Sequence, residues 1–440
     1  MKKLLVVWLC CLCPLAVGLD RQDNSVYRAR RETLAKRVNR GVIVLFADTE
    51  SPDAPRDAFR QSDNFYYLSG WTEPAAVMVI APAIAATEEA AARSYSEIFF
   101  LPPRNPRAER FTGAKLGPEN PDAARQTGFD KVEPLDKLGP ELAALSSQGF
   151  TLAYTELRSQ GQASPAGGAW DLLRRSVSVY LDDVGPFIDD MRRTKDAGEA
   201  DLIRKATAAS MQAHLAAMKA MKPGLTEREI AGLMYYQSSI GGCERWAYSP
   251  IVGSGINGTI LHYGENSKTI QDGDLVVIDV ACEYSMYASD ITRTLPANGK
   301  FTPRQREIYD IVLGAQNAAI AAFRSGKSVI GPGPDGLQQV AYDFINTHGK
   351  DLHGQPLGKY FIHGLGHHVG LEVHDVGDRK KPLEPGTVFT IEPGIYLPEE
   401  SFGVRIEDMF YVDPSGKLIQ LTASLPRNAE DVERTMARKK

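Results

Sequence analysis

Two aspartates lie eleven residues apart in runs typical of adjacent β-strands, and this pair constrains the fold more than any other feature. Asp279 lies in the apolar run 275–280, and Asp290 lies in the run 288–292. Because the separation is odd, a turn centred near residues 284–285 would place the two carboxylates directly opposite each other, roughly 5 Å apart at Cβ. Two like charges this close, one of them in an apolar strand, are strongly unfavourable unless a cation neutralises them. The pair therefore predicts a metal site.

A second acidic pair repeats this arrangement downstream. Glu392 lies in the run 389–394, and Glu407 lies fifteen residues later in the run 403–408. A connection centred on residues 399–400 would again place the two carboxylates opposite each other.

A histidine-rich stretch lies between the two predicted hairpins. It contains His363, His367 and His368, and His374 follows closely. Four carboxylates and at least one imidazole from three segments match a two-metal site for hard divalent ions. Oxygen-dominated ligation favours manganese, cobalt or magnesium over a structural zinc ion, which prefers cysteines.

Simple salt bridges or a helical zinc-protease motif would account for these residues less well. Salt bridges to Arg293 and Arg405 would neutralise part of the acidic charge, but two arginines cannot compensate four carboxylates. Salt bridges would also leave His367 without a role. A helical zinc-protease motif would use His363 and His367, which are four residues apart. Two glycines lie between them, however, and the glutamate of that motif is absent.

The segment 253–258 fits the dinucleotide-binding pattern G-x-G-x-x-G. That pattern requires a following helix N-terminus, whereas residues 259–263 are typical of a strand. We therefore interpret the segment as a glycine-rich turn that lets the backbone approach a substrate. His262 lies just after this turn and is a further candidate for the site.

Length and composition exclude some function classes. A chain of 440 residues is long enough for two or three domains, and its hydrophobic fraction of 43% is ordinary for a globular enzyme. The formal net charge is −5, and no basic patch of the kind that binds nucleic acid is present. A DNA or RNA partner is not expected.

The first eighteen residues are typical of a bacterial secretory signal peptide. Lys2 and Lys3 precede the apolar stretch 4–17, and small residues at 16–18 form a cleavage signal. The stretch is too short to span a membrane, so we expect no membrane span in the mature chain. This predicts an exported protein, periplasmic or secreted; a buried N-terminal strand in a cytoplasmic protein is the alternative.

Three of the five cysteines lie within this peptide. The remaining two, Cys243 and Cys282, are too few for a disulfide framework even in an oxidising compartment. We expect both to be packing residues.

The rest of the chain divides into two parts. Residues 19–185 mix helix and strand without clustered ligands and are expected to form an N-terminal α/β domain, with strands at 42–46, 76–80 and 97–101. Residues 186–440 are expected to form the catalytic domain. Three of its helices are predicted from the sequence. The first begins near residue 198, the second begins at a capping box formed by Thr226 and Glu229, and the third begins at Pro303. The alternation of these helices with strands predicts an α+β fold.

Five residues in this order and in these strand contexts resemble the ligands of the pita-bread metallopeptidases: Asp279, Asp290, His367, Glu392 and Glu407. That family includes methionine aminopeptidases, Xaa-Pro aminopeptidases and prolidases. Residues 59–74 are also similar to the first domain of bacterial Xaa-Pro aminopeptidases, which methionine aminopeptidases lack. The resemblance implies a pita-bread (creatinase/aminopeptidase) catalytic domain preceded by a smaller α/β domain.

The resemblance also implies how the five residues act. They would bind two divalent ions, usually manganese in this family, with Asp290 and Glu407 bridging both ions. A hydroxide between the ions would be the nucleophile. Glu392 would take up its proton and pass it to the departing nitrogen.

Four further residues receive roles from the same resemblance. His363 would stabilise the oxyanion, and His262 and His374 would hold the substrate around the scissile carbonyl and the proline. Arg405 would hold the carboxylate network in place.

The implied activity is metal-dependent release of the first residue from peptides with proline in the second position. An Xaa-Pro bond has no N–H, so a peptidase that recognises that N–H cannot cleave it. Two alternatives stay open: a prolidase that acts only on Xaa-Pro dipeptides, and a non-catalytic binding module on the same fold. The family also leads us to expect a homo-oligomer, either a dimer or a tetramer.

Overall fold

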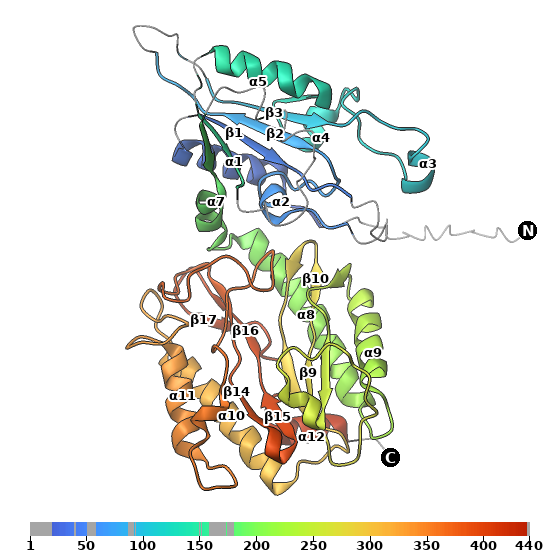
Figure 1. The fold of residues 1–440 in the computed structure, drawn as a ribbon, viewed down its shortest axis with the longest axis vertical. Coiled ribbons are helices and arrows are strands. Elements are labelled where there is room, and N and C mark those ends of the chain that lie inside the picture. The colour runs from blue at the N-terminus through green and yellow to red at the C-terminus, as the bar shows by residue number, and fades with distance from the viewer. Residues whose placement is uncertain are drawn as a thin grey trace, which may run out of the picture.

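The computed structural model describes residues 20–38, 41–50, 59–86, 92, 94–148, 150, 152–157, 173 and 180–437. They form two lobes, with the N-terminal lobe above the C-terminal lobe in Figure 1. The predicted signal peptide, residues 1–18, lies outside the described residues. Across the described part of the chain, no helix is both long and apolar enough to cross a lipid bilayer.

A six-stranded mixed sheet forms the N-terminal lobe, with the strand order β4-β3-β2-β1-β5-β6. The strands are β1 (Val42–Phe46), β2 (Val77–Ala81), β3 (Ser96–Leu101), β4 (Lys131–Pro134), β5 (Leu152–Thr155) and β6 (Tyr180–Asp183). The three strands expected from the sequence are confirmed as β1 to β3, within one residue. Every residue of β1 and β2 is buried, which explains why both are continuous apolar runs.

Helices cover both faces of this sheet (Figure 1). The lobe contains α1 (Asn24–Val38), α2 (Asp63–Ser69), α3 (Glu109–Thr112), α4 (Ala123–Thr127), η1 (Leu135–Lys137) and α5 (Leu138–Ser147). Leu34 of α1 and Phe65 of α2 share a hydrophobic core with Ile43 on one face, whereas Leu142 of α5 shares a second core with Val44 on the other. All seven residues of α2 are buried, so this helix has no amphipathic pattern that a sequence could reveal.

α7 (Gly185–Arg192) precedes the helices of the C-terminal lobe, which are α8 (Ala197–Ala220), α9 (Glu227–Ile240), α10 (Pro303–Ala322), α11 (Leu337–His348) and α12 (Ala429–Met436). The capping box of Thr226 and Glu229 at the start of α9 is confirmed, as is the start of α10 at Pro303. α7 lies between the two lobes in Figure 1. The domain boundary after residue 185 stays a prediction.

Short antiparallel strands form the centre of this lobe. They are β7 (Arg245–Trp246), β8 (Ile251–Ser254), β9 (Leu275–Asp279), β10 (Cys282–Tyr284), β11 (Tyr287–Ala288), β12 (Thr292–Pro296), β13 (Val388–Ile391), β14 (Gly394–Leu397), β15 (Phe402–Arg405), β16 (Asp408–Val412) and β17 (Leu418–Gln420). Three 3-10 turns join them: η3 (Gly255–Thr259), η4 (Leu357–Tyr360) and η5 (Pro398–Glu400). The α8–α9 pair packs on one half of these strands and the α10–α11 pair on the other.

The alternation of side chains along β9 determines where the acidic groups point. Val276 and Ile278 pack into the core formed with α8 and α9. Asp279 belongs to the opposite face, because successive side chains of a strand point to opposite sides. On that face, Asp279 lines a cavity of the C-terminal lobe.

The first acidic pair does not have the predicted register. β9 pairs with β12 so that Asp279 lies opposite Thr292 instead of Asp290. The two-residue turn is Ser285–Met286, which have positive φ angles of 49° and 73°, one residue beyond the expected position. Asp290 therefore lies diagonally from Asp279 but on the same face, because the shift is two residues.

The second acidic pair has the register that the sequence predicts. Gly394 lies opposite Arg405 in one ladder, and Ile391 lies opposite Asp408 in the other. Both ladders place Glu392 opposite Glu407, and η5 forms the expected connection around residues 399–400.

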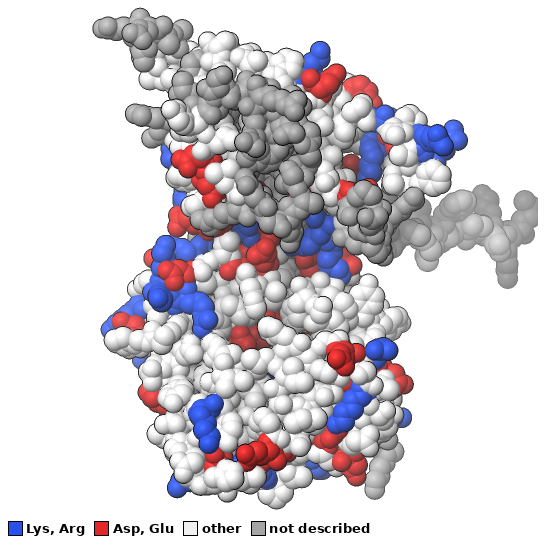
Figure 2. All heavy atoms as spheres, viewed as in Figure 1, with Lys and Arg blue, Asp and Glu red and all other residues white. Residues whose placement is uncertain are grey.

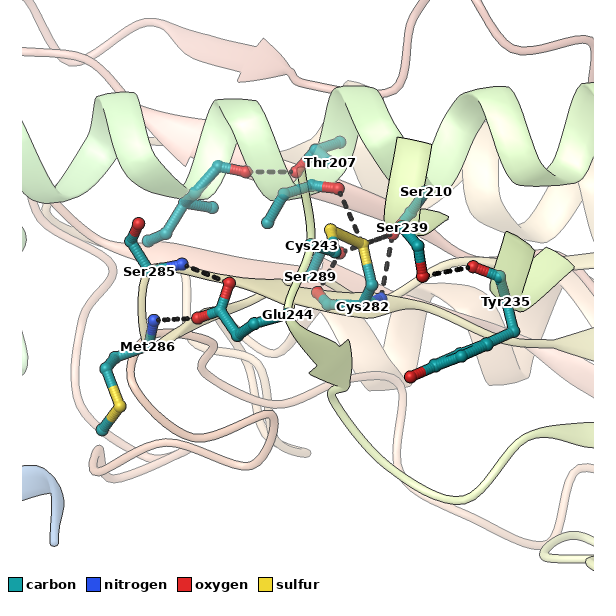
Figure 3. The surroundings of a disulfide bond; sticks show 12 residues. Thr207, Ser210, Tyr235, Ser239, Cys243, Glu244, Cys282, Ser285, Met286 and Ser289 are labelled. Atoms are coloured by element: carbon teal, nitrogen blue, oxygen red, sulfur yellow. Dashed lines mark hydrogen bonds between the residues drawn. A yellow bond between two sulfur atoms is a disulfide. The ribbon is translucent and has the colours of Figure 1, made fainter. Parts of the chain in front are cut away.

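The prediction that Cys243 and Cys282 are only packing residues is wrong, because they form a disulfide. Their Cα atoms are 6.0 Å apart, and Ser210 of α8 donates a hydrogen bond to the sulfur of Cys282 (Figure 3). The pairing of β7 with β10 brings the end of α9 next to β10. The two cysteines are 39 positions apart in the sequence and come together only through the pairing of β7 with β10. The spacing of the cysteines in the sequence does not reveal this pairing.

The sequence led us to expect a strand after the glycine-rich segment 253–258, and this prediction is wrong. The segment forms the end of β8 and the turn η3, and residues 260–263 continue as irregular chain. A side chain at Gly403 of β15 would collide with the carbonyl oxygen of Gly258. The glycines therefore allow this segment to pack closely on β15.

Candidate metal centre

Acidic side chains from the connections between separate strands converge on the ring of His367. Its Nε2 atom lies 3.2 Å from Asp290 Oδ2, 3.4 Å from Glu392 Oε1 and 3.9 Å from Glu407 Oε1. Ligand atoms of Asp290, His367 and Glu407 all lie within 4.8 Å of one another. This spacing would allow the three side chains to share an ion.

Asp279 joins this group through two neighbours. The hydroxyl of Tyr248 lies 2.6 Å from Oδ1 of both Asp279 and Asp290. Arg405 donates a hydrogen bond from Nη2 to the other oxygen of Asp279 at 2.6 Å. The structure thus brings all five predicted ligands to one place.

The electrostatics of these groups fit a cation. Burial and the charge of Asp279 raise the pKa of Asp290 to about 8. Burial and neighbouring carboxylates raise the pKa of Glu392 and Glu407 well above the ordinary value. A divalent cation would reverse these shifts, because it stabilises the charged form.

One buried atom also lacks a partner. Oε1 of Glu407 accepts no hydrogen bond from any described residue, although the residue is only 1% exposed. Buried acceptors without a donor are rare in folded proteins. A metal ion would supply the missing contact, so the donor set fits the group that the family resemblance implies.

The centre lies in a cavity of about 460 Å³. The five predicted ligands line it, and so do the other four predicted site residues, His262, His363, His374 and Arg405. The cavity is therefore lined by every residue that the sequence assigned to the site.

His363 is held by a chain of hydrogen bonds. Its Nδ1 contacts the carbonyl oxygen of Gly364, and its Nε2 contacts the hydroxyl of Tyr396, both at 2.8 Å. Arg405 donates to the same hydroxyl from Nη1 at 2.8 Å. Because a carbonyl can only accept, Nδ1 carries the proton and Nε2 accepts from Tyr396. Burial lowers the pKa of His363 to about 4, which keeps the ring neutral.

His374 packs its ring against His367, with centroids 4.1 Å apart. Burial lowers its pKa to about 4. The next residue, Asp375, is bound by Lys195 at 2.8 Å and by Arg192 at 2.5 Å. Arg192 also donates to Asn64 of α2 in the N-terminal lobe.

The N-terminal lobe contacts the same loop a second time. Arg60 donates a hydrogen bond to the carbonyl oxygen of Leu371 at 2.6 Å and to Glu283 at 2.7 Å. Charged side chains of both signs gather where the two lobes meet (Figure 2). The loop that carries His374 is therefore held between the lobes.

Sequence reasoning did not find three residues of the site. Tyr248 contacts two predicted ligands, Tyr396 joins His363 to Arg405, and Arg379 lines the cavity. Tyr248 lies in an aromatic, proline-containing segment without periodicity, and no local pattern marks it. Tyr396 could have been considered because it lies four residues after Glu392 in a strand.

Two family models match the chain. Metallopeptidase family M24 matches residues 201–414, and the aminopeptidase P N-terminal domain matches residues 27–152. The first range contains all five predicted ligands, and the second contains most of the six-stranded sheet.

Relatives match along nearly the whole chain. The Xaa-Pro aminopeptidase of Escherichia coli (strain K12) is 33% identical and covers 95% of this chain and 98% of its own length. Xaa-Pro aminopeptidase 3 of Homo sapiens is 30% identical and covers 94% of this chain and 86% of its own length.

Solved structures share the fold. Proline aminopeptidase P II from Yersinia pestis superposes with a TM-score of 0.80 at 32% identity, covering 94% of this chain and 99% of its own. A zinc-substituted E. coli aminopeptidase P in complex with product superposes with a TM-score of 0.82 at 30% identity, covering 96% and 100%. These matches confirm the predicted pita-bread fold with a preceding N-terminal domain.

Proposed function

The chain belongs to metallopeptidase family M24 and has an aminopeptidase P N-terminal domain, and we propose that it removes the first residue from peptides with proline second. The observation that carries this proposal is the convergence of Asp290, Glu407 and His367 in a cavity lined by four further histidines. The matches to Xaa-Pro aminopeptidases along the whole chain, including the N-terminal lobe, support this substrate class over a methionine aminopeptidase.

We infer that the site holds two divalent ions, with manganese as the favoured metal. Five side chains would hold them: Asp279, Asp290, His367, Glu392 and Glu407. Four of the five offer carboxylate oxygens, the ligands that hard divalent ions prefer. When bound, the ions would polarise the scissile carbonyl and lower the pKa of water to near 7.

Glu392 is the proton carrier in this proposal. Its carboxylate faces the cavity, with Oε1 3.4 Å from His367 and Oε2 4.0 Å from His363. It takes up the proton of the attacking water and delivers it to the proline nitrogen as the peptide bond breaks.

The histidines orient the substrate. His262 and His374 lie at the cavity wall, where they contact the peptide on either side of the scissile carbonyl. His363 stabilises the oxyanion only if Nε2 exchanges the contact with Tyr396 for one with the substrate and carries a proton there, because Nε2 accepts from Tyr396 in this structure. Arg405 positions Asp279 and Tyr396 together.

Proline specificity follows from the chemistry of the bond. The Xaa-Pro nitrogen has no proton, so the site cannot depend on a hydrogen bond from that nitrogen. Recognition falls instead to the walls around the pyrrolidine ring and to the groups that hold the carbonyl.

The test uses the purified protein with an Xaa-Pro-Xaa tripeptide, an Xaa-Ala-Xaa control peptide and an Xaa-Pro dipeptide. We expect free Xaa from the proline tripeptide with added manganese, no product with chelator, and no product from the Glu392→Gln variant. Turnover of the dipeptide alone would identify a prolidase. Bound metal without turnover of any peptide would identify a non-catalytic module and overturn the proposal.

We further propose that the protein is exported and loses residues 1–18. The disulfide between Cys243 and Cys282 supports this, because such bonds persist mainly in oxidising compartments. N-terminal sequencing of protein from cell fractions tests it: a mature chain that begins at residue 19 in an extracytoplasmic fraction is expected. Light scattering tests the accompanying proposal of a dimer or tetramer.

A further inference from the structure

One buried carboxylate outside the metal centre collects an unusual set of hydrogen bonds. Glu227 is the first residue of α9 and is 0% exposed. No Lys, Arg or His of the described chain lies within ion-pair distance of it. A charge buried in this way is costly unless hydrogen-bond donors surround it.

Five hydrogen bonds reach the side chain of Glu227. Oε1 accepts from the backbone N–H of Ser254 at 2.8 Å, from the hydroxyl of Ser254 at 2.8 Å and from the amide of Asn257 at 3.1 Å. Oε2 accepts from the hydroxyl of Tyr263 and from the backbone N–H of Lys268, both at 2.9 Å.

All five donors belong to the segment 254–268, which we call the histidine loop because it carries His262. The donors lie on both sides of that residue: Ser254 and Asn257 precede it, and Tyr263 and Lys268 follow it. Each carboxylate oxygen binds one side of the loop. Glu227 also donates its own backbone N–H to the carbonyl oxygen of Lys268 at 3.0 Å.

The loop has little regular structure of its own to hold this shape. Residues 260–263 belong to no helix or strand, and Ile260 is 53% exposed. Leu261 and His262 nevertheless line the cavity of the metal centre. Something other than a strand ladder or a packed core must therefore hold them at the cavity wall.

We propose that Glu227 is a positioning residue for the peptidase reaction, which holds the histidine loop so that His262 meets the substrate. It contacts neither the predicted metal ligands nor the cavity, and it acts through the loop. The inference rests on the proposed function, because it concerns the substrate contact of His262. A displacement of about 1 Å in such a group can cost on the order of 100-fold in rate.

The test compares Glu227→Gln with the parent enzyme on the Xaa-Pro-Xaa peptide. Glutamine keeps the shape but turns an N–H₂ group toward donors, so it loses the contacts of one oxygen. We expect kcat/KM to fall on the order of 10- to 100-fold, mainly through KM, with unchanged metal content. The matched control is Glu229→Gln on the same turn of α9, whose exposed carboxylate forms hydrogen bonds, among the described residues, to Thr226 alone; its kcat/KM should equal that of the parent.

A double variant separates positioning from general destabilisation. If Glu227 acts through His262, then Glu227→Gln should change kcat/KM by less than about twofold when His262→Ala is already present. Full additivity of the two losses would overturn the proposal, as would a single variant with the kinetics of the parent.

Milder variants keep the test usable if Glu227→Gln fails to fold. Tyr263→Phe and Asn257→Ala each remove one donor to Glu227, and each should raise KM, as Glu227→Gln does. Unchanged KM in both would also overturn the proposal. If the parent enzyme itself cleaves no Xaa-Pro-Xaa peptide, the proposed function fails instead, so the two failures are distinguishable.

Discussion

Replacing Asp375 by asparagine should destabilise the folded protein strongly, although the residue is not a predicted ligand. The Asp375 side chain is 1% exposed and contacts Arg192 at 2.5 Å and Lys195 at 2.8 Å. The substitution leaves the shape of the side chain and removes its charge. Two buried cations then lose their shared partner.

The size of the effect follows from what each cation keeps. Arg192 retains a hydrogen bond to Asn64 and a more distant carboxylate, Asp63, at 3.6 Å. Lys195 is 1% exposed at its side chain and has no other carboxylate within ion-pair distance among the described residues. Breaking a buried pair by removing one partner costs about 3–5 kcal/mol, and we expect a value in this range.

The effect should depend on pH with a definite sign. Burial raises the pKa of Asp375, but the charges of Lys195 and Arg192 outweigh it and hold the pKa below the ordinary value of 3.8. A lowered folded-state pKa stabilises the protein above the unfolded-state pKa, and that stabilisation is lost as pH falls through the folded-state value. The difference between parent and variant should therefore be full at pH 7 and should narrow as pH falls below about 4.

Urea denaturation at several pH values measures this difference. The control is Asp201→Asn, which removes an exposed i,i+4 pair with Lys205 and should cost less than about 0.5 kcal/mol. The reasoning would be refuted if Asp375→Asn lowered the free energy of unfolding at pH 7 by no more than the control does. It would also be refuted if the difference in free energy of unfolding between parent and variant grew as the pH fell.

Three further predictions concern the site, the disulfide and a helix cap. Arg405→Lys cannot hold Asp279 and Tyr396 at once, so metal affinity or kcat should fall by about 10- to 100-fold, measured by metal titration and peptide turnover; unchanged values would contradict this role. Replacing both Cys243 and Cys282 by serine should lower the free energy of unfolding by about 2–4 kcal/mol, and reduction of the parent should do the same in denaturant. Thr302→Ala removes the capping box of α10 and should cost about 1 kcal/mol in thermal unfolding; no change would argue against the cap.

Local patterns in the sequence predicted the strands and helix starts well. β1, β9 and β13 are largely apolar runs in buried positions. The capping box of α9 depends only on residues three apart, and the start of α10 is marked by proline at its first position. The M24 fold and its N-terminal domain were also predicted, because the acidic residues occur in a specific order within those strands.

Predictions that needed the location of a turn were less secure. The connection between Glu392 and Glu407 contains a proline and two glutamates at the expected centre, and its register is right. The turn at Ser285–Met286 contains neither glycine nor asparagine, although both residues have positive φ. Without that mark, the turn was placed one residue too early and Asp290 was set opposite Asp279.

The order of residues along the chain was enough to identify the side chains that line the cavity together, because carboxylates and imidazoles in otherwise apolar or glycine-rich segments have few other reasons to be there. The partners that surround them became evident only in the folded chain. Tyr248 at the two aspartates, the disulfide, the buried Glu227 and the ion pairs of Asp375 all join segments far apart in the chain. Such contacts depend on how strands pair and lobes dock, and neither is encoded in the spacing of neighbouring residues.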